Sequence, residues 1–533
     1  MLEQRGHAGC RHHEERQTGG LDAVLGPVRT PLLHDTALDD SSGRKFRCKL
    51  PTPYSQASAA SEVLLKRPDA TVIQPPGDIV GKTLSDTGRP RIVVAGGGFG
   101  GVYTTLHLER LLGSSVQVTL ISRDNFFLFT PMLHEVAASD IDITHLVSPL
   151  RALLRHATVF IGEVESIDCR AKTVAVKHGL EEHVHELPYD HLVLALGSIT
   201  NFYGLPGLEQ HALTMKTLGD AIHLRNEVIA ALEEADAECA AGRDEALTFV
   251  VAGGGFAGVE TIAGLNDFVR EGLEFYPRIT PDRIRMVLVH SGAVILPELG
   301  ETLGRYAQNE LTRCGVEVIT NGRVAECSER GVRLMDGRVI PSRLLVWTAG
   351  TSPHPLIHDL PCQLDRGRIV VEETLAVPGW PGVWALGDCA LVPNSRTGKP
   401  HPPTAQHAIR EARTAARNIA ANLRGRAPVP FRFRTIGQLA AIGRRTGVAR
   451  VFGVNFSGFL AWWLWRTIYL SKLPRFEKKL RVAIDWTLDL IFSKDFVQFL
   501  TVRAPVMSTV PAGQIETVMP QSAATPAGRA EVA

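Results

Sequence analysis

Two stretches of the chain carry the same glycine pattern, G-x-G-x-x-G. Each follows a short run rich in β-branched residues, the first within Arg91–Val102 and the second within Leu247–Glu260. A strand, a glycine turn and a helix in this order let the backbone approach a pyrophosphate, to which the first N–H groups of the helix donate. One copy could be an ordinary tight turn, but two copies in strand context predict two dinucleotide sites. The glycines are Gly96, Gly98 and Gly101 in the first copy and Gly253, Gly255 and Gly258 in the second.

The strand after each glycine turn ends without the acidic residue that often binds the adenosine ribose. The first, Val116–Ser122, ends in Ser122, with Asp124 two residues further on. The second, Ile284–His290, ends in His290. A serine can still hydrogen-bond a ribose hydroxyl, Asp124 is equally compatible with a plain turn, and a lone histidine anchors a 2′-phosphate less well than arginine. The preference between NADH and NADPH therefore stays open.

Further strands and a helix indicate how the two nucleotide units are joined. We expect an α/β fold with two Rossmann-like dinucleotide-binding domains, the second inserted in the first, and a C-terminal amphipathic helical region that binds the membrane. Leu192–Ser198 leads out of the first unit, a helix spans about Gly219–Ala241, and Arg343–Thr348 and Gly382–Asp388 are later strands. The expected segments are a disordered tail at 1–88, the first domain at 89–211 and 338–425, the inserted domain at 212–337, the C-terminal region at 426–505 and a disordered tail at 506–533.

Composition excludes several classes of protein. The chain has 533 residues and a net charge of +1, so it has no basic field that would indicate nucleic acid binding. Its eight cysteines contain no C-x-x-C pair, which argues against a local redox disulfide and against a metal site, and favours a reducing compartment. No uncharged apolar run reaches the roughly 18 residues that a membrane-spanning helix needs.

The C-terminal region combines aromatic and basic residues. Two aromatic segments, Phe456–Leu473 and Val482–Leu500, are too short or too polar to span a bilayer. Interfacial aromatics with nearby basic residues are typical of helices that lie on an anionic membrane surface. A dimer interface or a buried core helix is the alternative. The basic residues are Lys472, Arg475, Lys478, Lys479 and Arg481.

Together these motifs resemble the two-dinucleotide flavoprotein superfamily over residues 89–505. Two further stretches, Leu128–Ala137 and Pro402–Glu411, together with the aromatic C-terminal region, are similar to the type II NADH:quinone oxidoreductases. The resemblance implies FAD in the first domain, NADH in the second, and a quinone near the helix that begins at Thr404. It also implies cofactor-binding roles for residues outside the six glycines, namely Ser122, Arg123, Thr130, Val164, Gly197, His290, Gly350, Asp388 and Ala405.

Three residues are expected to act in catalysis. The resemblance places Glu260 near the nicotinamide and the flavin, although an acid in the first helical turn could simply favour the helix dipole. It places Gln406 beside the quinone, although a surface glutamine on a helix often has no role. Arg410 stands where many members of the family carry a second glutamine, which puts the usual quinone contacts in doubt.

The expected function is FAD-dependent oxidation of NADH with two-electron reduction of membrane quinone, without proton pumping, on the cytoplasmic face of the cell membrane. One alternative is a soluble NAD(P)H-dependent reductase that passes electrons to a protein such as ferredoxin or rubredoxin. Another is a flavin redox sensor with little turnover. A sulfide:quinone oxidoreductase is disfavoured because no cysteine has a recognisable reactive setting. Whether the chain forms a homodimer stays open.

Overall fold

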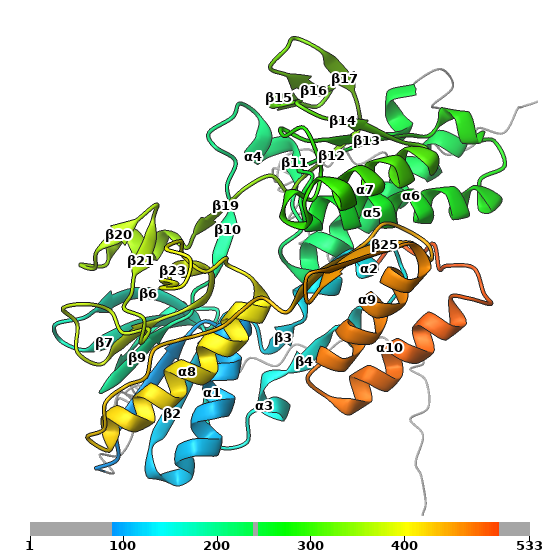
Figure 1. Ribbon diagram of the computed structural model, residues 1–533. Helices are drawn as coiled ribbons and strands as arrows, with labels where there is room; N and C mark the ends of the chain where they lie inside the picture. The colour runs from blue at the N-terminus through cyan, green and yellow to red at the C-terminus, as the bar shows by residue number, and fades with distance from the viewer. Residues whose placement is uncertain (1–87, 238–243, 500–533) are drawn as a thin grey trace, which may run out of the picture. The chain divides into compact units, whose positions relative to one another are not determined.

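The computed structural model describes residues 88–237 and 244–499. Apart from Gly88, the tails expected at 1–88 and 506–533 lie outside these residues. Two parallel sheets of five strands each form the centres of two nucleotide-binding units (Figure 1).

The first sheet is formed by strands from distant parts of the sequence. Its order is β22-β9-β1-β2-β5, and all neighbouring pairs are parallel. Parallel strands need apolar residues on both faces, and β1 buries four consecutive residues in this way. Helix α1 (Phe99–Leu112) follows β1, and α8 (Ala405–Leu423) packs against α1. The strands are β1 (Arg91–Ala95), β2 (Gln117–Ser122), β5 (Thr158–Ile161), β9 (His191–Leu194) and β22 (Val383–Ala385).

The second sheet repeats this arrangement with the order β11-β18-β12-β13-β14. Its strands are β11 (Ala212–Leu213), β12 (Thr248–Ala252), β13 (Arg285–Val289), β14 (Val316–Ile319) and β18 (Leu344–Trp347). Helices α5 (Leu218–Asp236), α6 (Phe256–Gly272) and α7 (Glu301–Arg313) belong to this unit. A capping box between Thr217 and Asp220 starts α5, which ends at Asp236, before the expected Ala241. Strand β18 lies beyond the expected boundary at 338, yet it pairs with β12 of the second sheet.

The chain crosses between the two units twice, and the two crossings pair with each other. Strand β10 (Ser198–Thr200) runs antiparallel to β19 (Thr351–Pro353). The expected strand Leu192–Ser198 is therefore divided, because β9 ends at Leu194 and the chain turns at Gly197, whose φ is +71°. This division places Gly197 and Gly350 at the junction between the two units.

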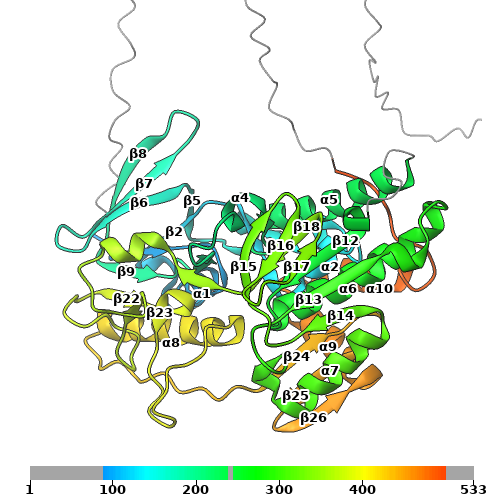
Figure 2. The ribbon, with the colours of Figure 1, turned by 90° about the horizontal axis from the view of Figure 1, so that it is seen from above.

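Smaller elements complete the fold, and Figure 2 shows β6, β7 and β8 projecting from the first unit. The short helices are α2 (Leu133–Ala137), α3 (Leu150–Leu153) and α4 (Leu208–His211). The short strands are β3 (Phe126–Leu128), β4 (Val147–Pro149), β6 (Glu163–Asp168), β7 (Thr173–His178), β8 (His183–Pro188), β15 (Val324–Ser328), β16 (Gly331–Leu334), β17 (Val339–Pro341), β20 (Leu364–Asp365), β21 (Arg368–Val370) and β23 (Ala390–Leu391).

The C-terminal region is an antiparallel sheet followed by two helices. The sheet contains β24 (Gly437–Ala441), β25 (Gly447–Val451) and β26 (Val454–Ser457), and the helices are α9 (Gly458–Lys472) and α10 (Phe476–Leu488). The expected segment Val482–Leu500 is helical only as far as Leu488. Within the described residues, every helix is too short or too polar to cross a bilayer.

Candidate active site

Three helices begin at one large, mostly apolar cavity of about 1350 Å³. The first residues of α1, α6 and α8 all line it. The residues that precede these helices, Gly98, Gly255 and Thr404, use no side chain to cap the backbone. Uncapped N–H groups at a helix start attract anions. A single small ligand usually occupies roughly 300–1,000 Å³, so this cavity is large enough for more than one ligand.

The first glycine loop combines two kinds of glycine. Gly96 has a φ of +116°, and a Cβ atom there would lie 2.2 Å from the Ala195 carbonyl oxygen. A Cβ atom at Gly101 would lie 1.8 Å from the Gly96 oxygen. These two glycines are required by the fold itself. Gly98, by contrast, has open space around its missing side chain and lines the cavity, so a ligand could approach its backbone closely.

The second loop has the same division of roles. Gly253 has a φ of +120°, and a Cβ atom at Gly258 would lie 1.8 Å from the Gly253 oxygen, whereas Gly255 is open. His290 packs against this loop, and its Nδ1 accepts a hydrogen bond from the Gly254 N–H at 3.1 Å. Burial lowers the pKa of His290, so the ring is neutral at pH 7. The loop glycines and His290 do not line the large cavity, but Phe256, Ala257 and Glu260 of the following helix do.

Five further predicted residues line the cavity: Thr130, Gly197, Gly350, Asp388 and Ala405. Asp388 Oδ2 accepts a hydrogen bond from Ser198 Oγ at 2.8 Å, and Lys216 Nζ donates to the same Oγ at 3.2 Å. Burial lowers the pKa of Lys216. The sequence analysis did not identify Ser198 or Lys216, because neither belongs to a recognisable motif.

Apart from the loop glycines and His290, three predicted cofactor-binding residues do not line the cavity. Ser122 lies behind the first glycine loop, where a Cβ atom on Gly97 would come within 2.1 Å of its Oγ. Arg123 follows it; burial lowers the pKa of His354, and the charge of Arg123 adds to this effect. Val164 lies on β6, which belongs to a separate antiparallel sheet. The structure therefore does not bring Arg123 and Val164 to the cavity, and Ser122 supports the loop from behind.

Glu260 is buried, with 6% of its surface exposed. It is the fifth residue of α6, and the first turn of this helix contains no acidic residue, so the alternative of a first-turn acid is wrong. Glu260 Oε1 accepts hydrogen bonds from the Trp465 indole N–H at 2.9 Å and the Ala441 N–H at 3.2 Å. Burial raises the pKa of Glu260 to about 8. The carboxyl group is therefore mainly protonated at pH 7.

Gln406 and Arg410 lie together at the start of α8. Gln406 Nε2 donates to the Gly437 carbonyl at 3.2 Å, and Arg410 Nη1 donates to the Gln406 carbonyl at 2.8 Å. The Arg410 guanidinium lies over the Phe433 ring, 4.2 Å from its centroid. The Thr404 hydroxyl pairs with His407 Nδ1 at 2.7 Å, so Thr404 occupies the expected cap position without capping the backbone. Both Gln406 and Arg410 line the cavity.

The loop Leu128–Ala137 contributes to the site as its sequence suggested. Phe129, Thr130 and His134 line the cavity. Burial lowers the pKa of His134 to about 4, so this side chain is neutral at pH 7. Its neighbour Glu135 accepts a hydrogen bond from the Trp486 indole N–H at 2.9 Å. The sequence analysis quoted this loop but named only Thr130 from it.

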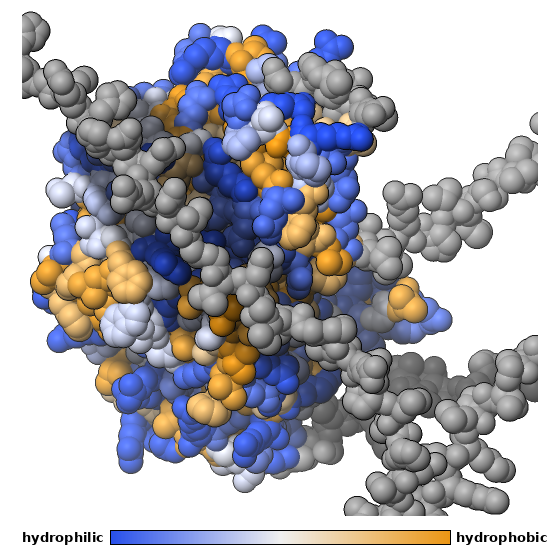
Figure 3. All heavy atoms as spheres, turned by 90° about the vertical axis from the view of Figure 1, so that its right-hand side faces the viewer, coloured by the Kyte–Doolittle hydropathy of each residue, from blue (hydrophilic) through white to orange (hydrophobic). Residues whose placement is uncertain are grey.

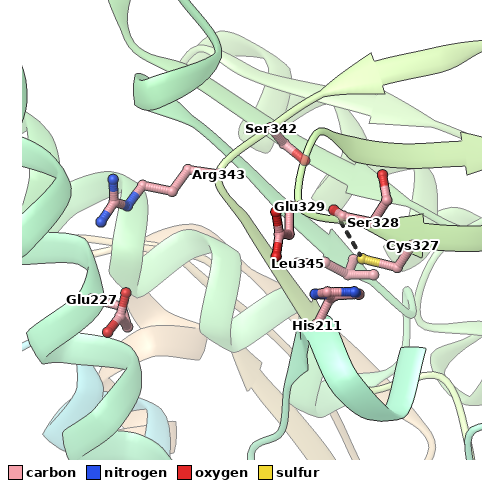
Figure 4. Close-up of a pocket in the computed structure, with 8 residues that line it drawn as sticks. All are labelled: His211, Glu227, Cys327, Ser328, Glu329, Ser342, Arg343 and Leu345. Atoms are coloured by element: carbon pink, nitrogen blue, oxygen red, sulfur yellow. Dashed lines mark hydrogen bonds between the residues drawn. The ribbon is translucent and has the colours of Figure 1, made fainter. Parts of the chain in front are cut away.

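A second, smaller pocket of about 240 Å³ lies in the second nucleotide unit (Figure 4). Cys327 Sγ contacts the Ser328 carbonyl there at 3.9 Å, and Arg343 points away from His211 and Glu329. None of the predicted site residues lines this pocket. Its lining residues are His211, Glu227, Cys327, Ser328, Glu329, Ser342, Arg343 and Leu345.

The five cysteines described are free, and none of them lines the large cavity. Cys389, next to Asp388, is fully buried, and burial raises the pKa of its thiol to about 11. Within residues 88–237 and 244–499, no group of three or more His, Cys, Asp or Glu side chains is arranged to hold a metal ion.

Comparison with known proteins agrees with this geometry. Residues 90–412 match the family model for pyridine nucleotide-disulphide oxidoreductases, and residues 436–495 match the NDH2 C-terminal domain. The chain is 32% identical to the type II NADH:quinone oxidoreductase Ndh of Mycobacterium tuberculosis over 423 residues, which is 76% of this chain and 89% of the relative. It is 33% identical to the demethylphylloquinone reductase NdbB of Synechocystis over 407 residues, 75% of this chain and 96% of the relative.

The fold has a close counterpart among solved structures. NDH2 of Plasmodium falciparum, solved in complex with NADH, superposes with a TM-score of 0.72 at 21% identity, covering 77% of this chain and 100% of that one. The family models account for the nucleotide-binding units and for the C-terminal region separately, and the relatives cover most of the chain. The chain belongs to the type II NADH:quinone oxidoreductases, within the pyridine nucleotide-disulphide oxidoreductase family.

Proposed function

We propose that the protein uses FAD to oxidise NADH and to reduce a membrane quinone by two electrons, without pumping protons. The observation that carries this proposal is the one large cavity that is lined by three uncapped helix starts, by Glu260 and by Gln406. FAD, when bound, supplies a group that takes a hydride from NADH and returns two electrons to an acceptor. The protein supplies binding, orientation and electrostatics.

Different residues of the chain bind FAD and NADH in this proposal. In this proposal the N–H groups after Gly98 bind the FAD pyrophosphate, and those after Gly255 bind the pyrophosphate of NADH. Asp388, which is oriented by Ser198, binds the ribityl hydroxyls. The free N–H groups of Ala405 and Gln406 stabilise negative charge near the flavin ring, because a helix start is a positive pole.

The quinone lies beside the start of α8 in this proposal. The Gln406 side chain is anchored on Gly437, and Arg410 is anchored on Gln406 and Phe433. An arginine only donates hydrogen bonds and keeps its charge, unlike the glutamine of many relatives. We therefore propose that Arg410 stabilises negative charge on the quinone oxygen, and that the protonated Glu260 contributes on the nicotinamide side.

The two C-terminal helices supply a surface for the membrane. Phe476, Leu480, Ile484 and Leu488 follow each other at four-residue spacing on α10 and are 80%, 53%, 47% and 46% exposed. On α9, Phe459, Leu460 and Trp463 are 62%, 51% and 51% exposed. Figure 3 shows hydrophobic patches on the side of the molecule that corresponds to the right of Figure 1. We propose that these residues, here called the apolar stripe, lie in the bilayer surface.

The basic cluster near the stripe is smaller than expected. Lys478 is buried and its Nζ donates to the Thr144 carbonyl at 2.7 Å, so it is unavailable to lipid. Arg475 pairs with Glu477 at 3.0 Å. Lys472 and Arg481 are exposed and remain available to anionic lipid. Because NADH is produced inside cells, we place the bound enzyme on the cytoplasmic face of the membrane.

The reaction is tested with purified protein under anaerobic conditions. NADH should bleach the flavin, and a short-chain quinone should restore its absorbance. Reoxidation by a ferredoxin-type protein but not by a quinone would favour the soluble reductase. Failure of NADH to bleach the flavin would favour the redox sensor.

Membrane binding is tested by point substitutions rather than by deletion. Trp465 and Trp486 are buried, so removing α9 and α10 would expose core residues. Leu480→Gln with Ile484→Gln should reduce flotation with anionic vesicles by at least tenfold, because each lost apolar side chain costs roughly 1.5–3 kcal/mol of burial. Val339→Gln, an exposed apolar position on β17, is the control. Unchanged flotation, with a change from dimer to monomer in light scattering, would assign the stripe to a second copy of the chain.

A further inference from the structure

The two helices that carry the apolar stripe also each bury one tryptophan. Trp465 of α9 is fully buried, and Trp486 of α10 is 6% exposed. Each indole N–H donates at 2.9 Å to a buried carboxyl group, Trp465 to Glu260 and Trp486 to Glu135. Neither membrane binding nor simple core packing requires a buried carboxyl group at the end of an indole. Of the two carboxyl groups, only that of Glu260 lines the large cavity.

The two oxygen atoms of Glu260 have different surroundings. Oε1 accepts two N–H groups, from Trp465 and Ala441. Oε2 lies 3.8 Å from His134 Nδ1, which is too far for a hydrogen bond. Because burial keeps His134 unprotonated and Glu260 protonated at pH 7, this contact is not an ion pair. With Oε1 already accepting two hydrogen bonds, the proton of Glu260 resides on Oε2.

We propose that Trp465 is a positioning residue for Glu260, whose indole N–H holds Oε1 so that Oε2 carries the acidic proton into the cavity. This inference rests on the proposed role of Glu260 in the reaction. It does not depend on membrane binding. It assigns to α9 a function in the active site, in addition to its exposed apolar face.

The groups that face Glu260 are few. His134 is buried and Tyr469 is partly buried beside it; burial lowers the pKa of His134 and raises that of Tyr469, so both are neutral at pH 7. Glu135 is the nearby acid, and burial raises its pKa to about 8. Arg466, Asp140 and Asp489 act on Glu135 rather than on Glu260. The Trp465 ring contacts His134 at 5.6 Å and Tyr469 at 4.7 Å between centroids, contacts that a phenylalanine ring would largely keep.

The test follows the carboxyl group itself by infrared difference spectroscopy of the FAD-loaded enzyme without substrate. The protonated-carboxyl band that disappears in Glu260→Gln belongs to Glu260. In Trp465→Phe the titration midpoint of this band should rise by about one pH unit, because a hydrogen bond that stabilises the carboxylate is lost. Trp463→Phe, on the same helix but 51% exposed, is the matched control and should leave the midpoint unchanged.

A second comparison separates positioning from general packing. Trp486→Phe removes an equivalent hydrogen bond at Glu135 and should move the Glu260 band by less than Trp465→Phe does. If Trp465→Phe does not fold, incorporation of benzothienylalanine at position 465 keeps the ring shape and removes only the N–H. An unchanged Glu260 midpoint in either folded variant would overturn the proposal. If Glu260→Gln keeps full activity while Trp465→Phe still shifts the band, the catalytic role of Glu260 fails but the positioning by Trp465 stands.

Discussion

The two glycine loops have nearly the same backbone but different surroundings. The first N–H of each loop donates at 2.9 Å to the end of the neighbouring strand, Gly96 to Ile121 and Gly253 to Val289. The first hydrogen bond of each following helix is 3.0 Å long, from Val102 to Gly98 and from Val259 to Gly255. The same sequence pattern thus produces the same phosphate-binding turn twice.

The two loops differ in the side chain that packs against each of them and in whether the loop lines the large cavity. Behind the first loop lies the small hydroxyl of Ser122, and behind the second lies the imidazole of His290, which accepts the Gly254 N–H. In front of the first loop the open glycine, Gly98, faces the large cavity, whereas Gly255 does not line it. The two loops therefore share a backbone conformation but differ in the side chain behind them and in whether their open glycine lines the cavity.

The largest effect should come from blocking the first loop. Gly98→Val adds a side chain in the space where we propose that the FAD pyrophosphate binds, while a Cβ atom there meets no protein atom within 4 Å. We expect folded protein without flavin, as measured by flavin absorbance and circular dichroism. Gly219→Val, in α5, is the control and should retain FAD, because a Cβ atom there would lie 3.6 Å from Thr217 Oγ1, an ordinary contact. Normal flavin content in Gly98→Val would refute the assignment of the first loop.

Blocking the second loop should impair the reaction with NADH without removing FAD. Gly255→Val should leave FAD bound but slow flavin reduction by NADH at least 100-fold, because the pyrophosphate of NADH can no longer approach the backbone. Stopped-flow bleaching measures this rate, and dithionite reduction shows that the flavin is intact. Loss of FAD from this variant would mean that the two loops are not independent.

Within the second loop, the two glycines Gly258 and Gly255 should differ in their effect on the stability of the fold. Gly258→Ala places a Cβ atom 1.8 Å from a carbonyl oxygen, whereas Gly255→Ala places it in open space. Without nicotinamide present, we expect Gly258→Ala to destabilise the fold by about 2–3 kcal/mol, or roughly 5–10 °C in Tm, and Gly255→Ala to change it little. Equal melting temperatures of Gly258→Ala and Gly255→Ala in calorimetry would contradict the different roles assigned to these two glycines.

The smallest effect concerns the nicotinamide preference. His290 is neutral at pH 7, so we expect NADH to be preferred over NADPH by less than about a thousandfold, or roughly 4 kcal/mol. His290→Asp should raise the preference for NADH by about tenfold, because a carboxylate repels the 2′-phosphate. Since its pKa lies below the ordinary 6.5, His290 gains charge only in acid, and the kcat/KM ratio should then move toward NADPH. A preference for NADH above about a thousandfold in the unsubstituted protein would mean that another residue selects the nucleotide.

The sequence alone determined the features that depend on local geometry. The glycine spacing identified both turns because only glycine fits at Gly96 and Gly253 and avoids the contacts at Gly101 and Gly258. The buried strands were visible because parallel sheets need continuous apolar runs. Gln406, Arg410, Thr130 and Asp388 were found through motifs and do line the cavity. Boundaries were less accurate, as with β18, because pairing partners distant in sequence decide where a strand belongs.

Only the tertiary structure decided which polar groups share the cavity. Ser198 donates to Asp388, and Lys216 donates to Ser198, through chain crossings that no local pattern records. The tryptophans of the C-terminal region divide into exposed Trp463 and buried Trp465, although they are two residues apart on one helix. Helical spacing predicts which residues of α9 share a face, but it does not predict which group the buried face contacts. Glu260 lies 205 positions from Trp465, and their hydrogen bond exists only because the fold removes both groups from water together.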